Sequence, residues 1–517
     1  MGDFLTTYAG VQPGKPAVVE HPPASGPTIV TFAELESRAN RLANALLSLG
    51  CGPGRKVLWC GPNSIGVVEI VNATRKIGAT AVPLNYRLSA DEAAYVTDHC
   101  DASVVIVDAE YAALFREIRA DVPNVEHVLV YGGEPLAGQE SVAALSAAAP
   151  DTEPPEREAE AAATMIYTSG TTGKPKGALR RTAADPQAVG ALLGLIGYTP
   201  DDIYITTGPL YHSGPGGFMG IAQALGQTVV IQRKFDPEDW LRLVDTYKVT
   251  STFSAPTPIR MICSLPHEVK SRYDRSSMRR TVANAAPWSM ALKQLYLADF
   301  PDDSLWEVYG STELGVNTVL APADQLRKPG SCGQAAPMVE IKLFDDDGNE
   351  VTGTGPEFPG ELFVRSSAVF SDYYKQHDKF LADQKHGFQT VGDIAYRDDE
   401  GYYYICDRKK DMIISGGMNV YPAEIEAALE QHPDIYEAAV IGIPSEEWGE
   451  LVHAVVVRRP GSTVEPDEIM AFAREHLASY KIPRSFSFVD ELPKTGSGKL
   501  LKRELRAPYW SGHQTKV

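Results

Sequence analysis

The sequence predicts an α/β protein with a large N-terminal domain and a small C-terminal α/β domain. Short apolar runs alternate with helix-period apolar residues over residues 30–107 and again over 201–345, which indicates βαβ units with mostly parallel sheets. After Phe344, short alternating segments broken by Gly, Pro and Asp predict a small β-rich subdomain. A compact α/β pattern begins beyond a run of charged residues. We therefore expect domains at residues 1–409 and 410–517.

Apolar spacing places the individual elements. In the first βαβ region, helices are expected at residues 30–50, 65–77 and 90–97, and strands at residues 56–60, 80–83 and 103–107. Farther along, strands are expected at residues 227–231, 304–308, 361–365 and 401–406, and a helix at residues 238–247. In the C-terminal domain, helices are expected from Pro422 and at residues 467–477, and strands at residues 437–443, 451–457 and 485–489. Residues 134–163, rich in Ala, Glu and Pro, predict an acidic connector.

Composition limits the class of protein. The 517 residues, 44% hydrophobic and 22% charged, are typical of a globular protein with several cores. No basic n-region opens the sequence and no apolar run approaches the roughly 20 residues that cross a bilayer, so we expect a cytoplasmic protein without a transmembrane segment. The six cysteines lack metal-site spacing and are expected to be reduced thiols. A net charge of −19 argues against nucleic acid as a partner.

The strongest chemical signal is the run Tyr167-Thr168-Ser169-Gly170-Thr171-Thr172-Gly173-Lys174-Pro175-Lys176-Gly177. Its glycines leave backbone N–H groups unshielded, and its hydroxyls and two lysines surround them, so the loop suits a polyphosphate. Pro175 stands where a Walker A loop requires Ser or Thr, which excludes that motif.

This run resembles the phosphate loop of the adenylate-forming superfamily, which comprises acyl-CoA synthetases, adenylation domains of peptide synthetases and luciferases. With the motifs below, the resemblance covers nearly the full chain and is most like fatty-acyl-CoA synthetases. It implies an N-terminal domain that carries most of the nucleotide site and a mobile C-terminal lid that rotates between two half-reactions. It also implies that the following residues close over the β- and γ-phosphates of ATP: Thr168, Ser169, Gly170, Thr171, Thr172, Gly173, Lys174 and Lys176.

A second motif, Val308-Tyr309-Gly310-Ser311-Thr312-Glu313, follows the apolar part of an expected strand. Gly310 allows close backbone approach to a planar ligand. The resemblance implies that Tyr309 stacks on adenine, that Thr312 contacts the phosphate and that Glu313 ligates Mg²⁺. The alternative for Glu313 is to cap a following helix.

A third motif pairs Gly392-Asp393 with Arg408, fifteen residues later. A carboxylate on a tight turn can accept both ribose hydroxyls, and an arginine can brace the same sugar. Relatives have Thr-Gly-Asp, and here Val391 takes the Thr place. A lone Asp is more often a turn former, so the assignment depends on its spacing to Arg408.

The fourth motif is the Gly-rich loop at residues 493–499, which ends in Lys499. By resemblance, Lys499 bridges the substrate carboxylate and the α-phosphate, because a cation lowers the cost of bringing two anions together. The alternative is an exposed lysine in a mobile tail. The resemblance also places the hinge of the lid at Lys410.

Three positions favour CoA as the acceptor. By resemblance, Gly416 and Gly417 line a pantetheine tunnel, Trp448 flanks it, and Tyr480 stacks on the CoA adenine. For the two aromatic residues the alternative is ordinary domain packing. No carrier-domain serine motif follows Lys499, which disfavours a peptide-synthetase module. A non-enzymatic nucleotide sensor would be expected to lack Lys499 or Glu313.

The acyl pocket is expected to be apolar. Residues 210–218 and 253–260 carry no lysine or acidic side chain, which disfavours amino-acid substrates. The resemblance gives the pocket residues as Tyr211, His212, Ala285, Ala286, Pro287 and Gly310. Asn284-Ala285 stands where relatives carry Gly-Gly, which should narrow the passage beside adenine.

These observations predict an AMP-forming acyl-CoA synthetase that uses ATP, Mg²⁺ and CoA on an apolar carboxylic acid, in the first instance a fatty acid. Two alternatives stay open. One is a CoA ligase for an aryl, alicyclic or steroid-type acid, and the other is an acyl-AMP ligase that serves a carrier protein. Peripheral membrane contact and a homodimer also stay open.

Overall fold

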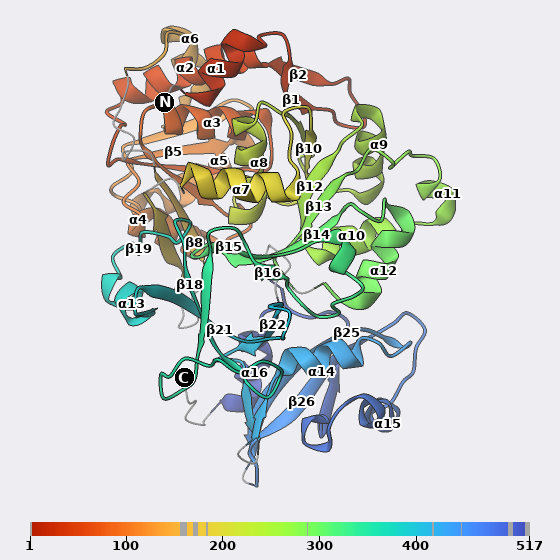
Figure 1. Ribbon diagram of the computed structural model, residues 1–517. Coiled ribbons are helices and arrows are strands. Elements are labelled where there is room, and N and C mark those ends of the chain that lie inside the picture. The colour runs from red at the N-terminus through yellow and green to blue at the C-terminus, as the bar shows by residue number, and fades with distance from the viewer. Residues whose placement is uncertain are drawn as a thin grey trace.

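The structure is a computed structural model that describes residues 3–155, 163–168, 174–181, 185–286, 288–415, 418–445, 447–494 and 500–511. Figure 1 shows a large N-terminal part, coloured from red to teal, and a small C-terminal part in blue. Helices pack on mixed sheets in both parts, which confirms the predicted α/β class. The domain boundary after residue 409 stays a prediction.

The first sheet is built around buried parallel strands. Its strands are β3 (Lys56–Cys60), β4 (Thr80–Leu84), β5 (Val104–Asp108), β6 (His127–Tyr131), β7 (Glu140–Ser141), β8 (Ala163–Thr168), β9 (Lys176–Arg180) and β19 (Asp372–Tyr373). They lie in the order β19-β9-β8-β4-β3-β5-β6-β7, and β8, β4, β3, β5 and β6 are parallel neighbours. The apolar run in β3 is buried on both faces, as a central parallel strand requires.

The helices that connect these strands include α3 (Ile65–Lys76), α4 (Ala90–His99) and α5 (Ala112–Glu117). Two helices come before them in the chain, α1 (Phe4–Val11) and α2 (Phe32–Ser48), and α2 leads directly into β3. Side-chain caps fix where they begin: Thr31 and Ser89 each form a capping box, at α2 and α4. The elements predicted in this region are confirmed to within a few residues.

The second sheet joins the first two strands of the chain to seven strands between residues 203 and 335. Its strands are β1 (Pro16–Glu20), β2 (Thr28–Thr31), β10 (Ile203–Thr206), β11 (Thr228–Ile231), β12 (Ser251–Ser254), β13 (Arg280–Ala283), β14 (Leu305–Ser311), β15 (Gly315–Leu320) and β16 (Gln334–Ala335). They lie in the order β16-β15-β14-β13-β12-β10-β11-β1-β2. The helices here are α7 (Pro186–Ile196), α8 (Ser213–Ala224), α9 (Pro237–Tyr247), α10 (Pro256–Cys263), α11 (His267–Lys270) and α12 (Met290–Asp299).

The β-rich subdomain predicted after Phe344 is confirmed. Its strands are β17 (Glu340–Phe344), β18 (Gly360–Arg365), β20 (Gln384–Lys385), β21 (Phe388–Arg397) and β22 (Tyr403–Arg408), and α13 (His377–Ala382) precedes β20. The C-terminal sheet has β23 (Ile413–Ser415), β24 (Met418–Val420), β25 (Ile435–Ser445), β26 (Gly449–Arg458) and β27 (Ser485–Phe488). Its helices are α14 (Pro422–Leu429), α15 (Pro466–His476) and α16 (Lys502–Trp510). Ile425 and Leu429 are fully buried on one face of α14, as predicted.

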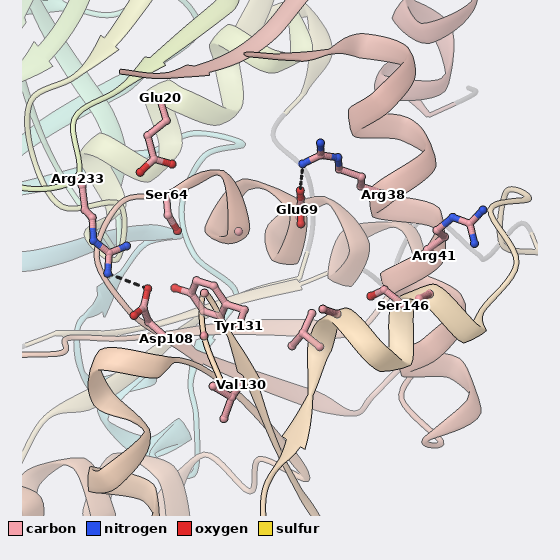
Figure 2. A pocket seen from close by; sticks show the side chains of 16 residues that line it. Glu20, Arg38, Arg41, Ser64, Glu69, Asp108, Val130, Tyr131, Ser146 and Arg233 are labelled. Carbon is pink, nitrogen blue, oxygen red and sulfur yellow. Dashed lines mark hydrogen bonds and ion pairs between the residues drawn. The ribbon is translucent and has the colours of Figure 1, made fainter. Parts of the chain in front are cut away.

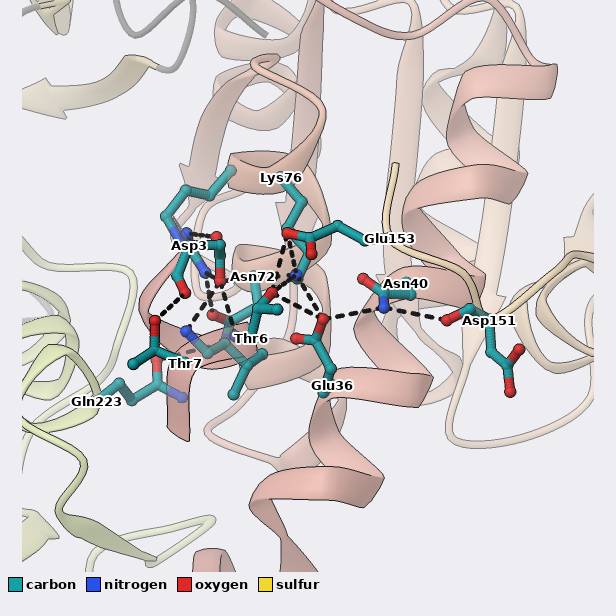
Figure 3. Close-up of polar contacts among 12 residues, drawn as sticks. Asp3, Thr6, Thr7, Glu36, Asn40, Asn72, Lys76, Asp151, Glu153 and Gln223 are labelled. Atoms are coloured by element: carbon teal, nitrogen blue, oxygen red, sulfur yellow. Dashed lines mark hydrogen bonds and ion pairs between the residues drawn. The ribbon is translucent and has the colours of Figure 1, made fainter. Parts of the chain in front are cut away.

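The acidic connector predicted at residues 134–163 contains a helix in its middle. This stretch contains α6 (Val142–Ala148), which Ser141 caps and which packs against α2. Beyond it, Asn40 donates to the carbonyl of Asp151 at 3.1 Å, and Lys76 lies 2.9 Å from Glu36 within the same polar cluster (Figure 3). These contacts join α3 to α2, and α2 to the chain that leads towards β8.

Two further expectations concern membrane-spanning helices and the cysteines. No helix among the described residues is long and apolar enough to cross a membrane. The six cysteines are free, and all but Cys406 are buried. Cytoplasmic location, peripheral membrane contact and a homodimer stay predictions.

Candidate active site

The motif at residues 308–313 forms a tight hairpin. Strand β14 extends through Ser311, and β15 begins at Gly315. A Cβ on Gly310 would lie 2.0 Å from the carbonyl oxygen of Gly315, so only glycine fits at this position of the hairpin. The alternative that Glu313 caps a helix is wrong, because a strand follows it.

Glu313 is buried in this hairpin. Its Oε1 accepts hydrogen bonds from the hydroxyls of Thr168, at 3.0 Å, and Tyr373, at 3.2 Å. Within the part of the chain that the structure describes, no donor reaches Oε2. One oxygen is thus held by neutral donors, which leaves the other available to a cation.

A single available carboxylate oxygen fits an Mg²⁺ ion that takes most of its ligands from the substrate phosphates and water. The described residues contain no group of three or more His, Cys, Asp or Glu that could hold a metal ion. Mg²⁺ is usually held by one or two carboxylates together with phosphate oxygens and water. Glu313 could supply the carboxylate, and the role stays a prediction.

Glu313→Gln should raise the Mg²⁺ concentration needed for half-maximal adenylate formation. The amide keeps the shape of the side chain but removes the anionic oxygen ligand. The measurement is pyrophosphate release over a Mg²⁺ titration. An unchanged titration would remove Glu313 from the metal site, and Glu110→Gln, at an exposed ion pair with Lys234, is the matched control.

Tyr309, Asp393 and Arg408 converge. The Tyr309 hydroxyl donates to Asp393 Oδ2 at 2.6 Å, and Arg408 Nε lies 3.3 Å from Asp393 Oδ1. Burial raises the pKa of Tyr309 well above its usual range, and the Asp393 carboxylate raises it further. The hydroxyl therefore stays protonated and holds the carboxylate in place.

The expected setting of Asp393 is wrong in one respect. Asp393 does not lie in a tight turn: it is inside β21, directly opposite Arg408 of β22 in the antiparallel ladder. The neighbouring Gly392 has a left-handed backbone, with φ of 82°, which is a local distortion of the strand rather than the expected turn. Strand pairing, rather than a turn, thus brings the carboxylate and the guanidinium together.

The phosphate-loop motif is described at its two ends only, since Ser169, Gly170, Thr171, Thr172 and Gly173 lie outside the described residues. Thr168 of β8 stands opposite Lys176 of β9 in an antiparallel pair. Lys176 is buried, which lowers its pKa, and its Nζ lies 5.5 Å from the centre of the Tyr373 ring. The Lys174 ammonium lies 4.6 Å from the ring centre of Tyr95. The two lysines therefore occupy different environments.

The loop at residues 284–286 is strained. Ala285 has φ of 74°, a left-handed conformation that favours glycine, and Asn284 Nδ2 donates to the carbonyl of Val308 at 2.5 Å. The Asn284 side chain thereby joins this loop to the strand that carries Tyr309. Ala286 is partly buried, and Pro287 lies outside the described residues.

Ala285→Gly should stabilise the protein by about 1 kcal/mol. The left-handed conformation costs alanine roughly 1–2 kcal/mol, and the greater freedom of unfolded glycine offsets roughly 0.4–1 kcal/mol of the gain. The urea unfolding midpoint measures the change. Ala286→Gly is the control: its φ is not positive, so it should lower the midpoint. A lower midpoint for Ala285→Gly would contradict the strain.

Tyr211 and His212 precede α8. Tyr211 is buried, and its ring packs edge-on against Tyr86 at 5.4 Å and lies 4.3 Å from the His212 ring. At the start of α8, Ser213 Oγ lies 2.8 Å from Thr312 Oγ1. The segment predicted to border the acyl group thus directly contacts the turn predicted to hold the phosphate.

Trp448 and Tyr480, two of the predicted CoA residues, have partners within the C-terminal part. The Arg484 guanidinium lies 4.0 Å from the ring centre of Trp448. Tyr480 packs against the core of the C-terminal sheet, and the neighbouring Lys481 lies 2.6 Å from Glu424. Both contacts agree with the domain-packing alternative. Gly416, Gly417 and Lys499 lie outside the described residues, so CoA contacts stay predictions.

Figure 2 shows a separate pocket of about 460 Å³, at the carboxyl ends of β5 and β6. Four of its six charged side chains are paired with each other: Arg233 with Asp108 at 3.0 Å, and Arg38 with Glu69 at 3.2 Å. None of the residues predicted from the motifs lines it.

Two residues beside Glu313 were not predicted from the sequence: Tyr373, which donates to its carboxylate, and Arg180, which donates to the carbonyl of Thr312 at 3.0 Å. Tyr373 stands in no recognised motif. The sequence offered a weak signal for Arg180, because a charged residue directly follows the apolar run Gly177-Ala178-Leu179.

Comparison with known proteins gives consistent matches. The family model for AMP-binding enzymes matches residues 5–374, and the model for their C-terminal domain matches residues 424–499. The chain is 34% identical to an indoleacetate–CoA ligase of Aromatoleum aromaticum, over 98% of this chain and 97% of that protein. It is 34% identical to the fatty acid–[acyl-carrier-protein] ligase ScoC of Streptomyces coeruleorubidus, over 99% and 96%. The crystal structure of ATP-bound MatB from Rhodopseudomonas palustris superposes with a TM-score of 0.86 at 29% identity, over 99% of this chain and 100% of that chain.

Proposed function

We infer that this chain, which belongs to the AMP-binding enzyme family, activates an apolar carboxylic acid as an acyl-adenylate and transfers the acyl group to CoA. The protein is an acid–thiol ligase that uses ATP and CoA. Our proposal goes further and names the class of acid, with a fatty acid first.

The reaction has two displacement steps. In the first, a carboxylate oxygen attacks the α-phosphorus of ATP and pyrophosphate leaves. In the second, the CoA thiolate attacks the acyl carbon and AMP leaves. We assign Thr312 to the phosphate, Asp393 and Arg408 to the ribose, and Lys499 to the meeting point of the two anions. Mg²⁺ bound at Glu313 would neutralise phosphate charge.

One observation carries the proposal: the 2.8 Å contact between Ser213 and Thr312 connects an apolar region to the phosphate turn. Beyond Ser213, Phe218 and Phe253 are buried and stack at 5.0 Å. A Cβ on Gly214 would lie 2.3 Å from the Phe253 ring, so glycine at this position allows the start of α8 to pack closely against that ring. Segments 210–218 and 253–260 contain no acidic residue that could pair with an α-ammonium group, which favours an apolar acid over an amino acid.

The test is a pyrophosphate-release screen of the purified protein. It compares straight-chain acids of rising length with benzoate, indoleacetate, a steroid-type acid and an amino acid, each with and without CoA. We expect kcat/KM to be highest for an apolar acid and lowest for the amino acid. A preference for the amino acid, or no pyrophosphate release with any apolar acid, would overturn the proposal.

A carrier protein is the second candidate acceptor, because a relative named as a fatty acid–[acyl-carrier-protein] ligase matches over nearly the whole chain. The assay separates the two acceptors directly. Acyl-adenylate is formed in place and chased with CoA or with a phosphopantetheinyl carrier protein. Transfer to the carrier alone would replace CoA in the proposal.

A further inference from the structure

Arg180 lies beneath the turn of the β14–β15 hairpin. It ends β9, the strand that leaves the phosphate-loop motif, and its side chain is only partly exposed. Nη2 donates to the carbonyl of Thr312 at 3.0 Å, and Nη1 donates to the carbonyl of Ala368. One guanidinium thus joins two segments that are far apart in the sequence.

Both of these segments reach Glu313. Thr312 precedes it directly, and Phe370, two residues after Ala368, donates its backbone N–H to the Glu313 carbonyl at 2.7 Å. The Thr312 hydroxyl is held separately by Ser213. Contacts on both sides therefore fix the backbone that presents the Thr312 hydroxyl and the Glu313 carboxylate.

Among the residues that the structure describes, no carboxylate contacts the Arg180 guanidinium directly. Burial lowers its pKa, and the nearby charge of Glu313 acts in the opposite direction. A partly buried cation that bonds neutral carbonyls loses hydration without gaining a charged partner, and this costs stability. Arg180 lies beside the turn to which we assign phosphate binding, so its retention there is better explained by the position of that turn than by stability.

We propose that Arg180 is a positioning residue for Thr312 and Glu313 in the binding of ATP and Mg²⁺. This inference rests on the proposed function. The planar fork of arginine bonds both carbonyls at once in fixed directions, whereas the single ammonium of lysine cannot reproduce that geometry. Arg180 acts through the turn and contacts neither reacting atom.

The test compares Arg180→Met and Arg180→Lys with a matched control. Arg119 also bonds two backbone carbonyls, those of Val122 at 3.2 Å and Val125 at 2.8 Å, on an element away from the turn. Calorimetric titration measures ATP affinity as a function of Mg²⁺ and needs no acid. Pyrophosphate release measures kcat and the KM for the acid, and urea unfolding measures stability.

We expect Arg180→Met to weaken Mg²⁺-dependent ATP binding and to lower the rate of adenylate formation, each by about 10–100-fold, the usual effect of losing an outer-shell partner. The KM for the acid should stay unchanged. Arg180→Lys should recover only part of the loss, and Arg119→Met should bind ATP normally. If Arg180→Met does not fold, Arg180→Lys becomes the deciding variant. Normal Mg²⁺-dependent ATP binding by Arg180→Lys would overturn the proposal that the guanidinium positions the turn.

A double-mutant cycle with Glu313→Gln tests the route of the effect. If Arg180 acts through this turn, the two losses in Mg²⁺-dependent affinity should be strongly non-additive, because the second change acts on a ligand already lost. Additive losses, or equal losses in Arg180→Met and Arg119→Met, would overturn the inference. Normal ATP binding by the parent protein without turnover of any apolar acid would instead overturn the proposed function.

Discussion

Replacing Lys499 by alanine should reduce adenylate formation from acid and ATP by about 10²–10³-fold, while thioester formation from supplied acyl-adenylate is retained. The cation is needed where two anions converge, and a lost preorganised electrostatic contact typically costs this much in rate. Single-turnover pyrophosphate release measures the first step, and acyl-CoA yield from synthetic acyl-adenylate measures the second.

The residues that flank Lys499 offer a control. Lys494 forms a β-bridge with Leu500, and the Leu501 N–H donates to the Pro493 carbonyl at 2.8 Å, so the two ends of this segment are paired. The Lys494 ammonium is committed to Glu437 at 2.7 Å. Lys494→Ala should therefore spare both steps. Equal damage to both steps in Lys499→Ala would contradict a lid that rotates between them.

The fold was predictable where local pattern and burial agree. Strand β3 has the bounds predicted for it, because a continuous apolar run buried on both faces leaves a parallel strand little freedom to shift. In contrast, β1 pairs in parallel with β11, more than two hundred residues away. Nothing in its short apolar run indicates which strand it joins, since pairing of distant strands is a tertiary choice.

The motif residues of the candidate site could be predicted from the sequence, whereas the residues that hold them in place could not. The motif gave Glu313, but only the pairing of β19 with β9 brings Tyr373 to its carboxylate. The same limit applies to Asp393: its spacing to Arg408 was informative, yet the ladder between β21 and β22 produced the contact. Local sequence fixes which residues carry the chemistry, and strand register fixes which of them meet.

The connector shows the opposite error. A composition rich in Ala, Glu and Pro predicted an acidic connector at residues 134–163, yet Ser141 caps a helix there. Alanine has the highest helix propensity, and a cap together with packing against α2 was sufficient. Composition alone did not reveal this contact.

The hinge proposed at Lys410 lies between two parts that the structure joins by specific contacts. Asp407, on the N-terminal side, accepts a hydrogen bond from the backbone N–H of Ala423 at 3.0 Å and lies 3.8 Å from Lys502 Nζ. A second contact joins α10 to β25, where Arg260 donates to the carbonyl of Tyr436 at 3.3 Å. If the C-terminal part turns about Lys410, the backbone of Lys410 must adopt a second φ/ψ state. The same rotation would break these contacts.

Lys410→Pro should therefore keep adenylate formation and lose transfer to CoA. Proline fixes φ near roughly −65°, which excludes one of the two hinge states. Pyrophosphate release in single turnover and acyl-CoA yield measure the two steps, and Lys410→Ala, which leaves φ free, should support both. Arg506 donates to the Lys410 carbonyl at 3.3 Å, a contact that neither substitution removes, so the variants differ mainly in backbone freedom. Acyl-CoA formation by Lys410→Pro at the parental rate would mean that the lid turns at another residue.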